Sequence, residues 1–523
     1  MTNPDLSPEL LEHILNWVEH RRDLISFACV SKMCKEFVIP RHTEYRVLRL
    51  SGGRDWVTTW NHLTRRLDLV SNFRTIHFVS MDNAAHRGGF RVPSTWEEKV
   101  DQARKIHLRN WKAEHIMKQI EAICEVMERV EMLHTFIWER LPGHTVIGGD
   151  EKRLLGLVAQ KPTLRRLELS DEWGLEGLFV SLEDIQHPIW HMAHLESLVI
   201  GYHDDEELLT QDENFGMWVQ SMSSTLTFLS IPEEIFVAHC DNFRLPSLTN
   251  LLLPTATDSD ETPPSVIVAF LESHPHIEEL SWMPRKSTKL ASGCLPNLQK
   301  LACSPEFFLA LDSADDQPLI PRRIEELGIT WRGKRGARIG VKRMVGSQCF
   351  DHTCLKRLRF ERWAADSFED HLLLAKTFPN IRRLNLRWRL KDSEDNLSKE
   401  QWIELLSSFS TLEAFLGDEL INSREPTELS EPEICQVVRN LAPQCPKLRQ
   451  IAHHAVVGAE AASPNDVYTK ITIIKEEPQG ETLTAFGATS SVEAGNGQKF
   501  RWERAEYPPR DRFQTMPWGD HEW

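Results

Sequence analysis

The sequence predicts an α/β solenoid, meaning one elongated domain built from repeated units, and two observations lead to this class. Six-residue segments with apolar residues at their first, fourth and sixth positions recur along most of the 523 residues. The copies that begin at Leu133, Leu164, Leu195 and Leu226 are spaced 31 residues apart. Self-similarity with a period of roughly 20 to 50 residues is typical of solenoids, whose units bury their apolar sides by stacking on neighbours.

Each copy is expected to form one short strand. Strand residues alternate between the two faces of a sheet, so the apolar residues of a copy are directed to the core and the residues between them to the opposite face. The copies begin at Phe73, Leu133, Leu164, Leu195, Leu226, Leu248, Ile277, Leu298, Ile324, Leu355, Ile381, Leu412 and Leu448.

From 73 to 455 the pattern resembles the leucine-rich repeat family. The resemblance implies that each strand is followed by a loop and by a helix or looser return, and that the units stack into a curved solenoid with one parallel sheet. The regular form of the family has Asn or Cys three positions after the last strand leucine. This chain has Glu172, His203 and Glu234 there, which favours an irregular, F-box-type array.

Composition argues against several classes of protein. The formal net charge of −16 opposes binding to nucleic acid, which needs a concentrated basic stripe. No apolar run reaches the roughly 18 residues of a membrane-spanning helix, and Met1 to Leu15 lacks the pattern of a secretory signal. The ten cysteines include no C-x-x-C pair, so neither a disulfide framework nor a zinc site is indicated. We therefore expect a protein of the cytoplasm or nucleus that binds neither nucleic acid nor membrane.

No catalytic or metal-binding motif is found, so no enzyme activity, cofactor or metal ion is expected. The nearest match to a phosphate loop, Gly328 to Arg335, lacks the hydroxyl residue that holds magnesium and lies on a repeat strand. Neither a G-x-S-x-G elbow nor an H-E-x-x-H helix occurs. We interpret the basic run from Arg332 to Arg343 as an exposed loop, with a nuclear localisation patch as the alternative.

Residues 6 to 39 are expected to form a compact helical segment. Ser7, Pro8 and Glu9 suit an N-cap, a first helical position and an acidic first turn. Apolar residues then recur at helical spacing, and Asp23 opens a second short helix. A segment of about 40 residues is too short to be a stable domain alone, so its apolar residues need a partner.

This segment resembles the F-box, the helical module that joins a substrate receptor to the Skp adaptor of SCF ubiquitin ligases. The family opens with L-P-x-E-L-L-x-x-I-L; here Ser7 displaces the proline by one position, and Cys34 stands where many members have Trp. Ser31 and Lys32 match the end of the family pattern. The resemblance implies adaptor contacts by Leu6, Pro8, Glu9, Leu10, Leu11, Ile14, Leu15, Leu24, Ile25 and Val30. The alternative is a helical cap on the repeat array.

The sheet face opposite the core is the predicted target surface, because it carries apolar and guanidinium groups of the kind found in interface hot spots. The candidate target-binding residues are Val199, Phe228, Leu252, Arg357, Arg359, Arg383 and Arg387. The arginine cluster suggests an acidic or phosphorylated target segment. The competing explanation is that Glu361 and neighbouring acids neutralise these arginines within the fold.

The sequence thus predicts the substrate-recognition adaptor of an SCF-type ubiquitin ligase. Its F-box binds a Skp-type adaptor and through it a cullin, and its repeats bind a protein target that the sequence does not identify. A protein-binding scaffold with no ligase attached is the alternative. The expected organisation is an F-box-like module at 1–45, a linker and first strand at 46–82, the repeat solenoid at 83–457, and a C-terminal cap with a mobile tail at 458–523.

Overall fold

The chain consists of two compact units, Met1–Leu248 and Thr249–Trp523. The computed structural model describes residues 7–18, 21–39, 41–51, 57–79, 113–140, 149–171, 186–201, 213–254, 264–284, 288, 290–291, 293–312, 321–329, 341–360, 367–386, 397–417, 431–455, 467–475, 489–493 and 499–507.

The first unit opens with a helical module of four short helices. As predicted, the Ser7 side chain caps the first helix by accepting a hydrogen bond from the Leu10 amide, and Ser31 caps the third helix in the same way. The module has its own small core, formed by Leu15, Leu24, Ala28 and Val38. Its helices are α1 (Pro8–Trp17), α2 (Arg21–Ala28), α3 (Lys32–Val38) and α4 (Arg41–Glu44).

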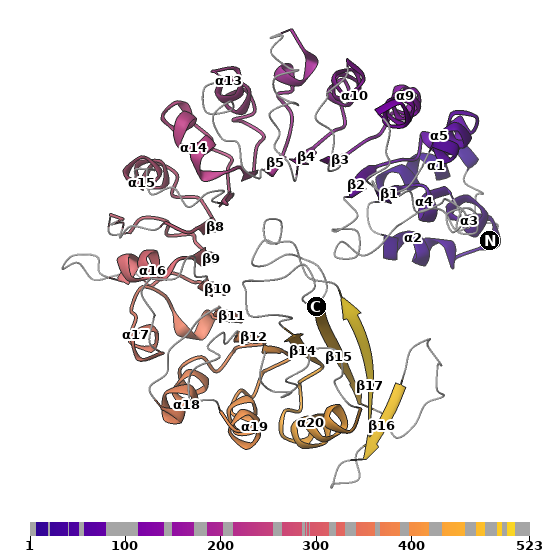
Figure 1. Ribbon diagram of the computed structural model, residues 1–523. Coiled ribbons are helices and arrows are strands. Elements are labelled where there is room, and N and C mark those ends of the chain that lie inside the picture. Colours follow the sequence, from indigo (N-terminus) through magenta and orange to yellow (C-terminus); the bar gives the residue numbers. More distant parts are fainter. Residues whose placement is uncertain are drawn as a thin grey trace, which may run out of the picture. The chain divides into compact units, whose positions relative to one another are not determined.

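A parallel sheet follows in the first unit, and its strands pair in the order of the sequence. The described strands are β1 (Val47–Ser51), β2 (Thr75–Val79), β3 (Thr135–Arg140), β4 (Arg166–Asp171), β5 (Ser197–Gly201) and β6 (Phe228–Ser230). The connecting helices are α5 (Val57–Thr64), α6 (Leu67–Val70), α9 (Ala113–Arg129), α10 (Gly149–Ala159), η3 (Pro188–His191), α13 (Glu213–Ser221), α14 (Glu233–His239) and η4 (Cys240–Asn242). Within this unit the strands line the inner side of an arc and the connecting helices the outer side (Figure 1).

The second unit repeats this arrangement with parallel strands β7 to β14. The strands are β7 (Asn250–Leu253), β8 (Glu279–Trp282), β9 (Lys300–Cys303), β10 (Glu326–Ile329), β11 (Arg357–Phe360), β12 (Arg383–Leu386), β13 (Ala414–Gly417) and β14 (Gln450–Ala455). The helices are α15 (Pro264–Ser273), α16 (Pro305–Asp312), α17 (Val341–Val345), η5 (His352–Cys354), α18 (Phe368–Thr377), α19 (Lys399–Ser407) and α20 (Glu431–Gln444).

The sheet of the second unit ends in antiparallel strands. β14 pairs with β15 (Val467–Lys475), which pairs with β17 (Lys499–Tyr507), and β17 pairs with β16 (Thr489–Glu493). β15 therefore covers the edge of the last repeat strand, within the region expected to form a C-terminal cap. The described repeat strands of this unit are parallel, as predicted, and the antiparallel strands lie beyond them in that region. Antiparallel strands need no helical crossover between them and can pair with an exposed strand edge.

The apolar residues of each copy are buried, as predicted. In one copy the side chains of Leu195, Leu198 and Ile200 are fully buried, and their neighbours Ser197 and Val199 are half-buried on the other face. Burying one such aliphatic side chain stabilises the fold by about 1.5–3 kcal/mol. Because the strands are in register with their neighbours, the apolar side chains of each copy pack against those of the next copy. Each unit is therefore a stretch of α/β solenoid of the leucine-rich repeat type.

Threonine hydroxyls join successive repeats. A threonine directly before the first apolar residue of a copy donates to the carbonyl of the equivalent apolar residue one repeat earlier. Among the described residues this hydroxyl ladder has three members, each at 2.8 Å: Thr163 to Leu133, Thr225 to Leu195 and Thr411 to Ile381. Asn380 donates in a related way to the Thr353 carbonyl at 2.8 Å.

Candidate interaction surfaces

The first helix of the N-terminal module has two distinct apolar faces. Leu10, Ile14 and Trp17 are exposed, and Leu11 and Leu15 are buried. Residues three and four apart lie on the same side of a helix, so each set forms its own stripe. One stripe packs into the module, and the other is left on the surface.

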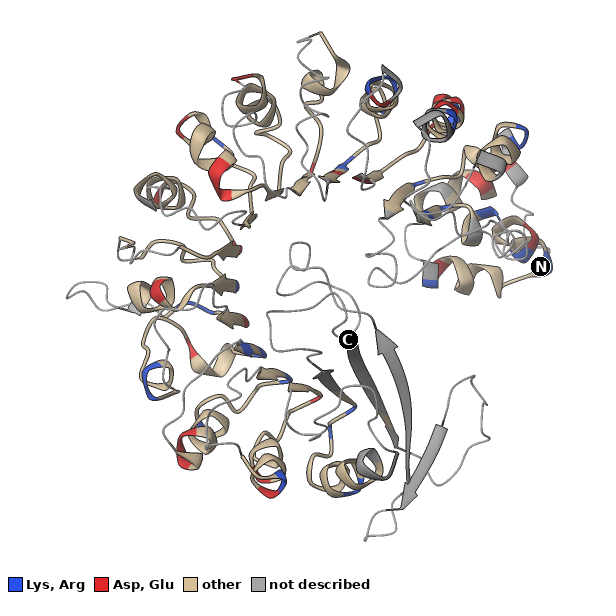
Figure 2. Cartoon of the chain, in the orientation of Figure 1, with Lys and Arg blue, Asp and Glu red and all other residues tan. Residues whose placement is uncertain are grey.

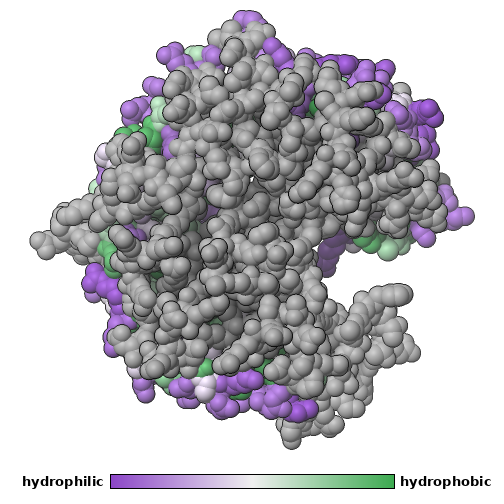
Figure 3. Space-filling view, viewed as in Figure 1, coloured by the Kyte–Doolittle hydropathy of each residue, from purple (hydrophilic) through white to green (hydrophobic). Residues whose placement is uncertain are grey.

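The exposed stripe belongs to a larger set that we call the exposed apolar surface. In the described part of the chain, eight large apolar side chains are exposed, and seven of them lie between residues 10 and 39. These seven are 40% to 75% exposed: Leu10, Ile14, Trp17, Ile25, Val30, Met33 and Ile39. Figure 3 shows an apolar area over α2. The eighth residue, Met217, lies far along the chain on α13.

The residues predicted to contact an adaptor divide between surface and core. Leu10, Ile14, Ile25, Val30 and Glu9 are exposed. Three others are buried, Leu11, Leu15 and Leu24, so their placement on the contact surface is corrected: an amphipathic module needs an inner face, and these leucines form it. Leu6 lies outside the described residues, and Pro8 is the first residue of α1.

Sequence reasoning missed three members of the exposed apolar surface, namely Trp17, Met33 and Ile39. Trp17 follows Ile14 by three residues and Leu10 by seven, so helical spacing does place it on the same stripe. The helical spacing of the apolar residues predicted the helix but did not separate its two apolar faces. For Met33 and Ile39 the sequence showed no helical repeat of apolar residues, because α3 is only 7 residues long.

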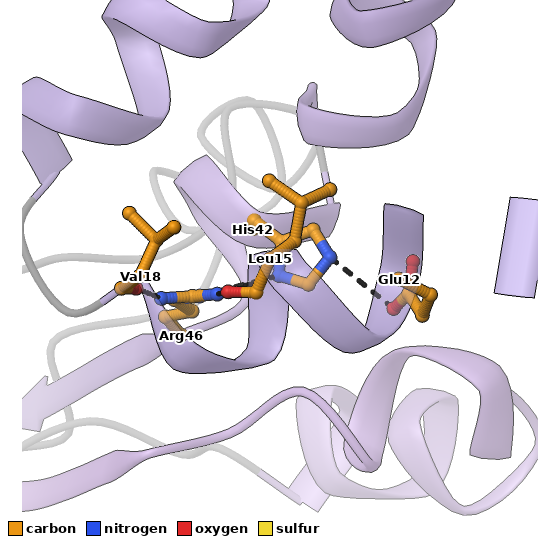
Figure 4. Close-up of polar contacts among 5 residues, drawn as sticks. All are labelled: Glu12, Leu15, Val18, His42 and Arg46. Carbon is orange, nitrogen blue, oxygen red and sulfur yellow. Dashed lines mark hydrogen bonds and ion pairs between the residues drawn. The ribbon is translucent and has the colours of Figure 1, made fainter. Parts of the chain in front are cut away.

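A buried arginine fastens the module to the sheet (Figure 4). Arg46, directly before β1, donates hydrogen bonds through its guanidinium to the carbonyls of Leu15 and Val18 at the end of α1. Its Nε donates to His42 Nδ1 at 3.2 Å, and His42 Nε2 lies 3.2 Å from Glu12 Oε1 on α1. The last carbonyls of a helix have no partner within the helix and form the negative end of its dipole, so a guanidinium suits this position.

Burial affects the protonation of Arg46 and His42 at this junction between the module and the sheet. Desolvation lowers the pKa of Arg46 to about 10, with a smaller contribution from the nearby positive charge of Arg74, so Arg46 remains charged at neutral pH. Desolvation likewise lowers the pKa of His42, outweighing the opposing effect of Glu12. His42 Nδ1 accepts from Arg46, which is only a donor, so the neutral ring carries its proton on Nε2 beside Glu12.

Two predicted target-binding residues lie on the inner face of the first unit. Val199 on β5 and Phe228 on β6 are both half-buried, and Val199 is in register with Ser230, whereas Phe228 is in register with Ser197. They therefore lie diagonally on neighbouring strands. Leu252, in the second unit, is buried, so its assignment to an exposed apolar subsite is wrong: it packs within the fold.

The predicted arginine cluster lies on β11 and β12 of the second unit. Arg357, Arg359 and Arg383 are half-buried there, and we call these three the arginine surface. Arg357 is in register with Arg383, and Arg359 with Asn385. Arg387 lies outside the described residues.

The first of these arginines already binds a carboxylate of its own chain. A guanidinium nitrogen of Arg357 lies 3.1 and 3.2 Å from the two carboxylate oxygens of Glu326 on β10. Burial raises the pKa of Glu326, although Arg357 and Lys300 act in the opposite direction. Glu361, which the sequence suggested as a neutralising acid, lies outside the described residues. The acid that pairs with Arg357 is Glu326.

The basic run beside the rejected phosphate loop is only partly described. Lys342 and Arg343 lie on α17, so this end of the run is helical where a loop was expected. Lys342 Nζ is 3.3 Å from Asp370 Oδ2 on α18. Residues 332 to 338 lie outside the described residues.

Three further findings concern sites of other kinds. The ten cysteines are free thiols. Within the described residues, no group of histidines, cysteines and carboxylates is placed to hold a metal ion. None of the helices in that same part of the chain has the length and apolar character to cross a membrane.

Comparison with known proteins finds similarity only to solved structures. No protein family model matches the sequence, and no curated protein sequence matches it. Among solved structures, the chain is similar to the crystal structure of the Rad7 and Elc1 complex in yeast, with 10% sequence identity, 80% of this chain and 90% of that chain covered, and a TM-score of 0.30. A similarity this weak does not indicate a function for this chain.

Proposed function

We propose that this chain is the substrate-recruiting adaptor of an SCF-type ubiquitin ligase. Its helical module binds a Skp-type adaptor and through it a cullin, and its repeat array binds a protein target. The observation that carries the proposal is the exposed apolar surface, because seven of the eight exposed large apolar side chains in the described residues gather on this one small module.

Such a surface favours a docking module over a mere end cap. Terminal caps of repeat arrays present a polar outer face to water, whereas this module presents Leu10, Ile14 and Trp17. Concentrated apolar surface marks an interaction site, and removing it from water contributes about 25 cal/mol per Å² of area buried. Trp is also among the residues that dominate interface energies.

The hydrogen bonds between Arg46 and the end of α1 support the same function. An adaptor that recruits a target must hold the target at a defined position relative to the ligase. A docking module joined to the array by a flexible linker would not fix that position. Here a charged side chain beside β1 binds the end of α1 directly. The array can then present a target, while any ubiquitin chemistry belongs to the partners. The location proposed with this function is the cytoplasm or the nucleus.

The test is co-purification of the full chain with a Skp-type adaptor and a cullin. The variant combines Ile14→Asp and Trp17→Asp, which place two charges against an apolar partner at a cost of several kcal/mol. Both residues are exposed, so the fold should survive, as circular dichroism can confirm. Met217→Asp is the control, since Met217 is 57% exposed, between Ile14 at 40% and Trp17 at 75%, and lies elsewhere on α13.

We expect the double variant to lose the adaptor and the control to keep it. Retention of adaptor and cullin by the double variant would reject the exposed apolar surface as the docking site. If the wild-type chain captured target proteins but no adaptor, the scaffold alternative would hold.

A further inference from the structure

The charged residues of the helical module are divided unequally among its helices. α2 and α3 together carry four cations and two carboxylates, whereas α1 carries two carboxylates and neither lysine nor arginine. The balance is therefore +2 on α2 and α3 and −2 on α1, in a chain whose formal charge is −16. Figure 2 draws Lys and Arg in blue and Asp and Glu in red. The residues are Arg21, Arg22, Asp23, Lys32, Lys35 and Glu36 on α2 and α3, and Glu9 and Glu12 on α1.

The cations of α2 and α3 lie beside exposed apolar side chains of the same helices. Residues three or four apart share one side of a helix. Arg22 therefore lies on the side of Ile25, and Lys35 on the side of Ile39, which directly follows α3. These four side chains are all exposed. The part of the exposed apolar surface that belongs to α2 and α3 is thus bordered mainly by positive charge.

These cations are available to a partner, because the fold does not use them. Within the described part of the chain, the charged groups of Arg22 and Lys35 make no ion pair and no hydrogen bond. Lys32 Nζ lies 3.8 Å from Glu36 Oε1, and the two side chains are 91% and 67% exposed, so water screens this contact. Exposed cations on the repeats, by contrast, include two that are paired at 2.7 Å: Arg153 with Glu128, and Lys356 with Glu325.

Solubility alone does not account for the sign of this border. Charges of either sign keep an apolar surface soluble, and aspartate and glutamate do so better than lysine and arginine. Acidic residues also outnumber basic ones in the whole chain, 77 to 61. A border that served only solubility would be expected to follow the acidic composition of the chain, and this one does not.

We propose that the partner that covers α2 and α3 presents an apolar face bordered by aspartate and glutamate side chains. The proposal rests on the proposed function, under which this partner is the Skp-type adaptor. Apolar burial supplies the main driving force of such an interface, while charges at its border steer the encounter and fix its orientation. The carboxylates of the partner meet α2 and α3 and avoid α1, where Glu9 and Glu12 would repel them.

The first experiment measures the association and dissociation rates of the full chain with a Skp-type adaptor by surface plasmon resonance. We expect the association rate to fall steeply as salt is raised, because exposed charges are screened. The dissociation rate should change little, since charges at the border of an interface act mainly on association.

Two double variants with the same change of net charge locate the effect. Arg22→Glu with Lys35→Glu should slow association roughly tenfold at low salt, because the attraction becomes a repulsion. Lys376→Glu with Lys399→Glu is the matched control, since both lysines are exposed on α18 and α19 of the second unit. It should leave the association rate close to that of the wild type.

One further variant should improve binding. Glu36→Gln removes an exposed carboxylate from the border and leaves Lys32 without its acidic neighbour. Association with the adaptor should become severalfold faster. A gain of this kind cannot come from misfolding, so the variant is informative even if the Arg22→Glu and Lys35→Glu double variant is unstable.

The second experiment uses probes that do not depend on the ligase. Two fluorescein-labelled amphipathic helical peptides have the same leucine and tryptophan face, which is flanked by Glu in one and by Lys in the other. Fluorescence anisotropy should show tighter binding of the Glu peptide to the full chain, and the Arg22→Glu and Lys35→Glu variant should lose this preference. Non-specific attraction to a chain of charge −16 would favour the Lys peptide instead.

The outcomes separate this proposal from the proposed function. Adaptor association that is insensitive to salt, equal effects of the two double variants, or no gain with Glu36→Gln would overturn the acidic border and leave adaptor docking intact. Tighter binding of the Lys peptide, or no binding of either peptide, would also overturn it. If the chain captured no adaptor, the proposed function would fail, whereas a preference for the Glu peptide would still support a partner with an acidic border.

Discussion

The guanidinium of Arg46 donates a hydrogen bond to the carbonyl of Leu15, 31 residues earlier in the chain. Leu15 lies in the last turn of α1 and Arg46 immediately before β1, so one side chain spans the junction between module and sheet. The backbone carbonyl of Arg46 also accepts from the amides of Arg74 and Thr75 at 2.8 and 3.0 Å. The same residue thus connects α1, β1 and the start of β2.

Replacing Arg46 should loosen this junction. Arg46→Ala removes the charged donor from two helix-terminal carbonyls and leaves His42 without its donor, at a cost of roughly 2–4 kcal/mol. We expect faster hydrogen exchange in α1 and α4 and a lower midpoint in thermal unfolding. Arg41→Ala is the control, because Arg41 is exposed at the start of α4. Unchanged exchange in α1 would show that the module is held by other contacts.

The junction should also weaken in mild acid. The pKa of buried His42 is lowered from its ordinary 6.5, chiefly by desolvation, so the unfolded state binds a proton more readily than the folded state. The stabilising effect of neutral His42 is therefore fully present above about pH 6.5 and is lost as the pH falls below that value towards the folded pKa. Protonated His42 would also turn an N–H towards Arg46, while only Glu12 favours the charged form.

Hydrogen exchange of α1 between pH 7.5 and 5.5, corrected for intrinsic rates, measures this effect. We expect protection to decrease as the pH is lowered. His42→Gln keeps an acceptor and a donor without titrating in this range, and it should flatten the profile. A wild-type profile as flat as that of His42→Gln would contradict the assignment.

The fold could be predicted from sequence because burial and periodicity coincide. Leu164, Leu167 and Leu169 are fully buried, and the same spacing returns often enough to identify a parallel array. The antiparallel end was not predicted as such, because strand direction depends on the connection, and the apolar pattern of Val467 to Ile474 is the same in either direction.

The interaction surfaces were predicted less well, for a physical reason. Leu10 and Leu11 are identical residues at adjacent positions, and only the rotation of α1 against α2 and α3 decides that one is exposed and the other buried. Leu252 was assigned to the surface by strand alternation, but it is buried. The pairing of Arg357 with Glu326 depends on the register of separate repeats, which spacing alone does not fix.

The hydroxyl ladder should contribute to the stability of each unit. Thr225→Val and Thr411→Val keep the shape of the side chain and remove the donor to the carbonyls of Leu195 and Ile381. Each should lower the free energy of unfolding by about 1 kcal/mol, the net value of a typical hydrogen bond. Urea denaturation followed by circular dichroism measures the change.

The control for the ladder is Thr64→Val, because the Thr64 hydroxyl bonds only within its own helical turn, to the Asn61 carbonyl at 3.0 Å, and is expected to change little. Equal effects of Thr64→Val and Thr225→Val would mean that bonds between repeats have no special weight.

Substitutions of Leu10 and Leu11 should distinguish a loss of adaptor docking from a loss of folding stability. Leu11→Ala opens a cavity at the buried face of α1 and should cost roughly 2–5 kcal/mol of stability. Leu10→Ala removes an exposed side chain, so unfolding should change by less than about 0.5 kcal/mol, while the affinity for a Skp-type adaptor should fall by roughly tenfold because apolar burial at the interface is lost. Urea denaturation and calorimetric titration with the adaptor measure the two quantities on the same preparations. If Leu10→Ala bound the adaptor as tightly as the wild type, or if it unfolded as readily as Leu11→Ala, the division of α1 into an outer docking face and an inner core face would be wrong.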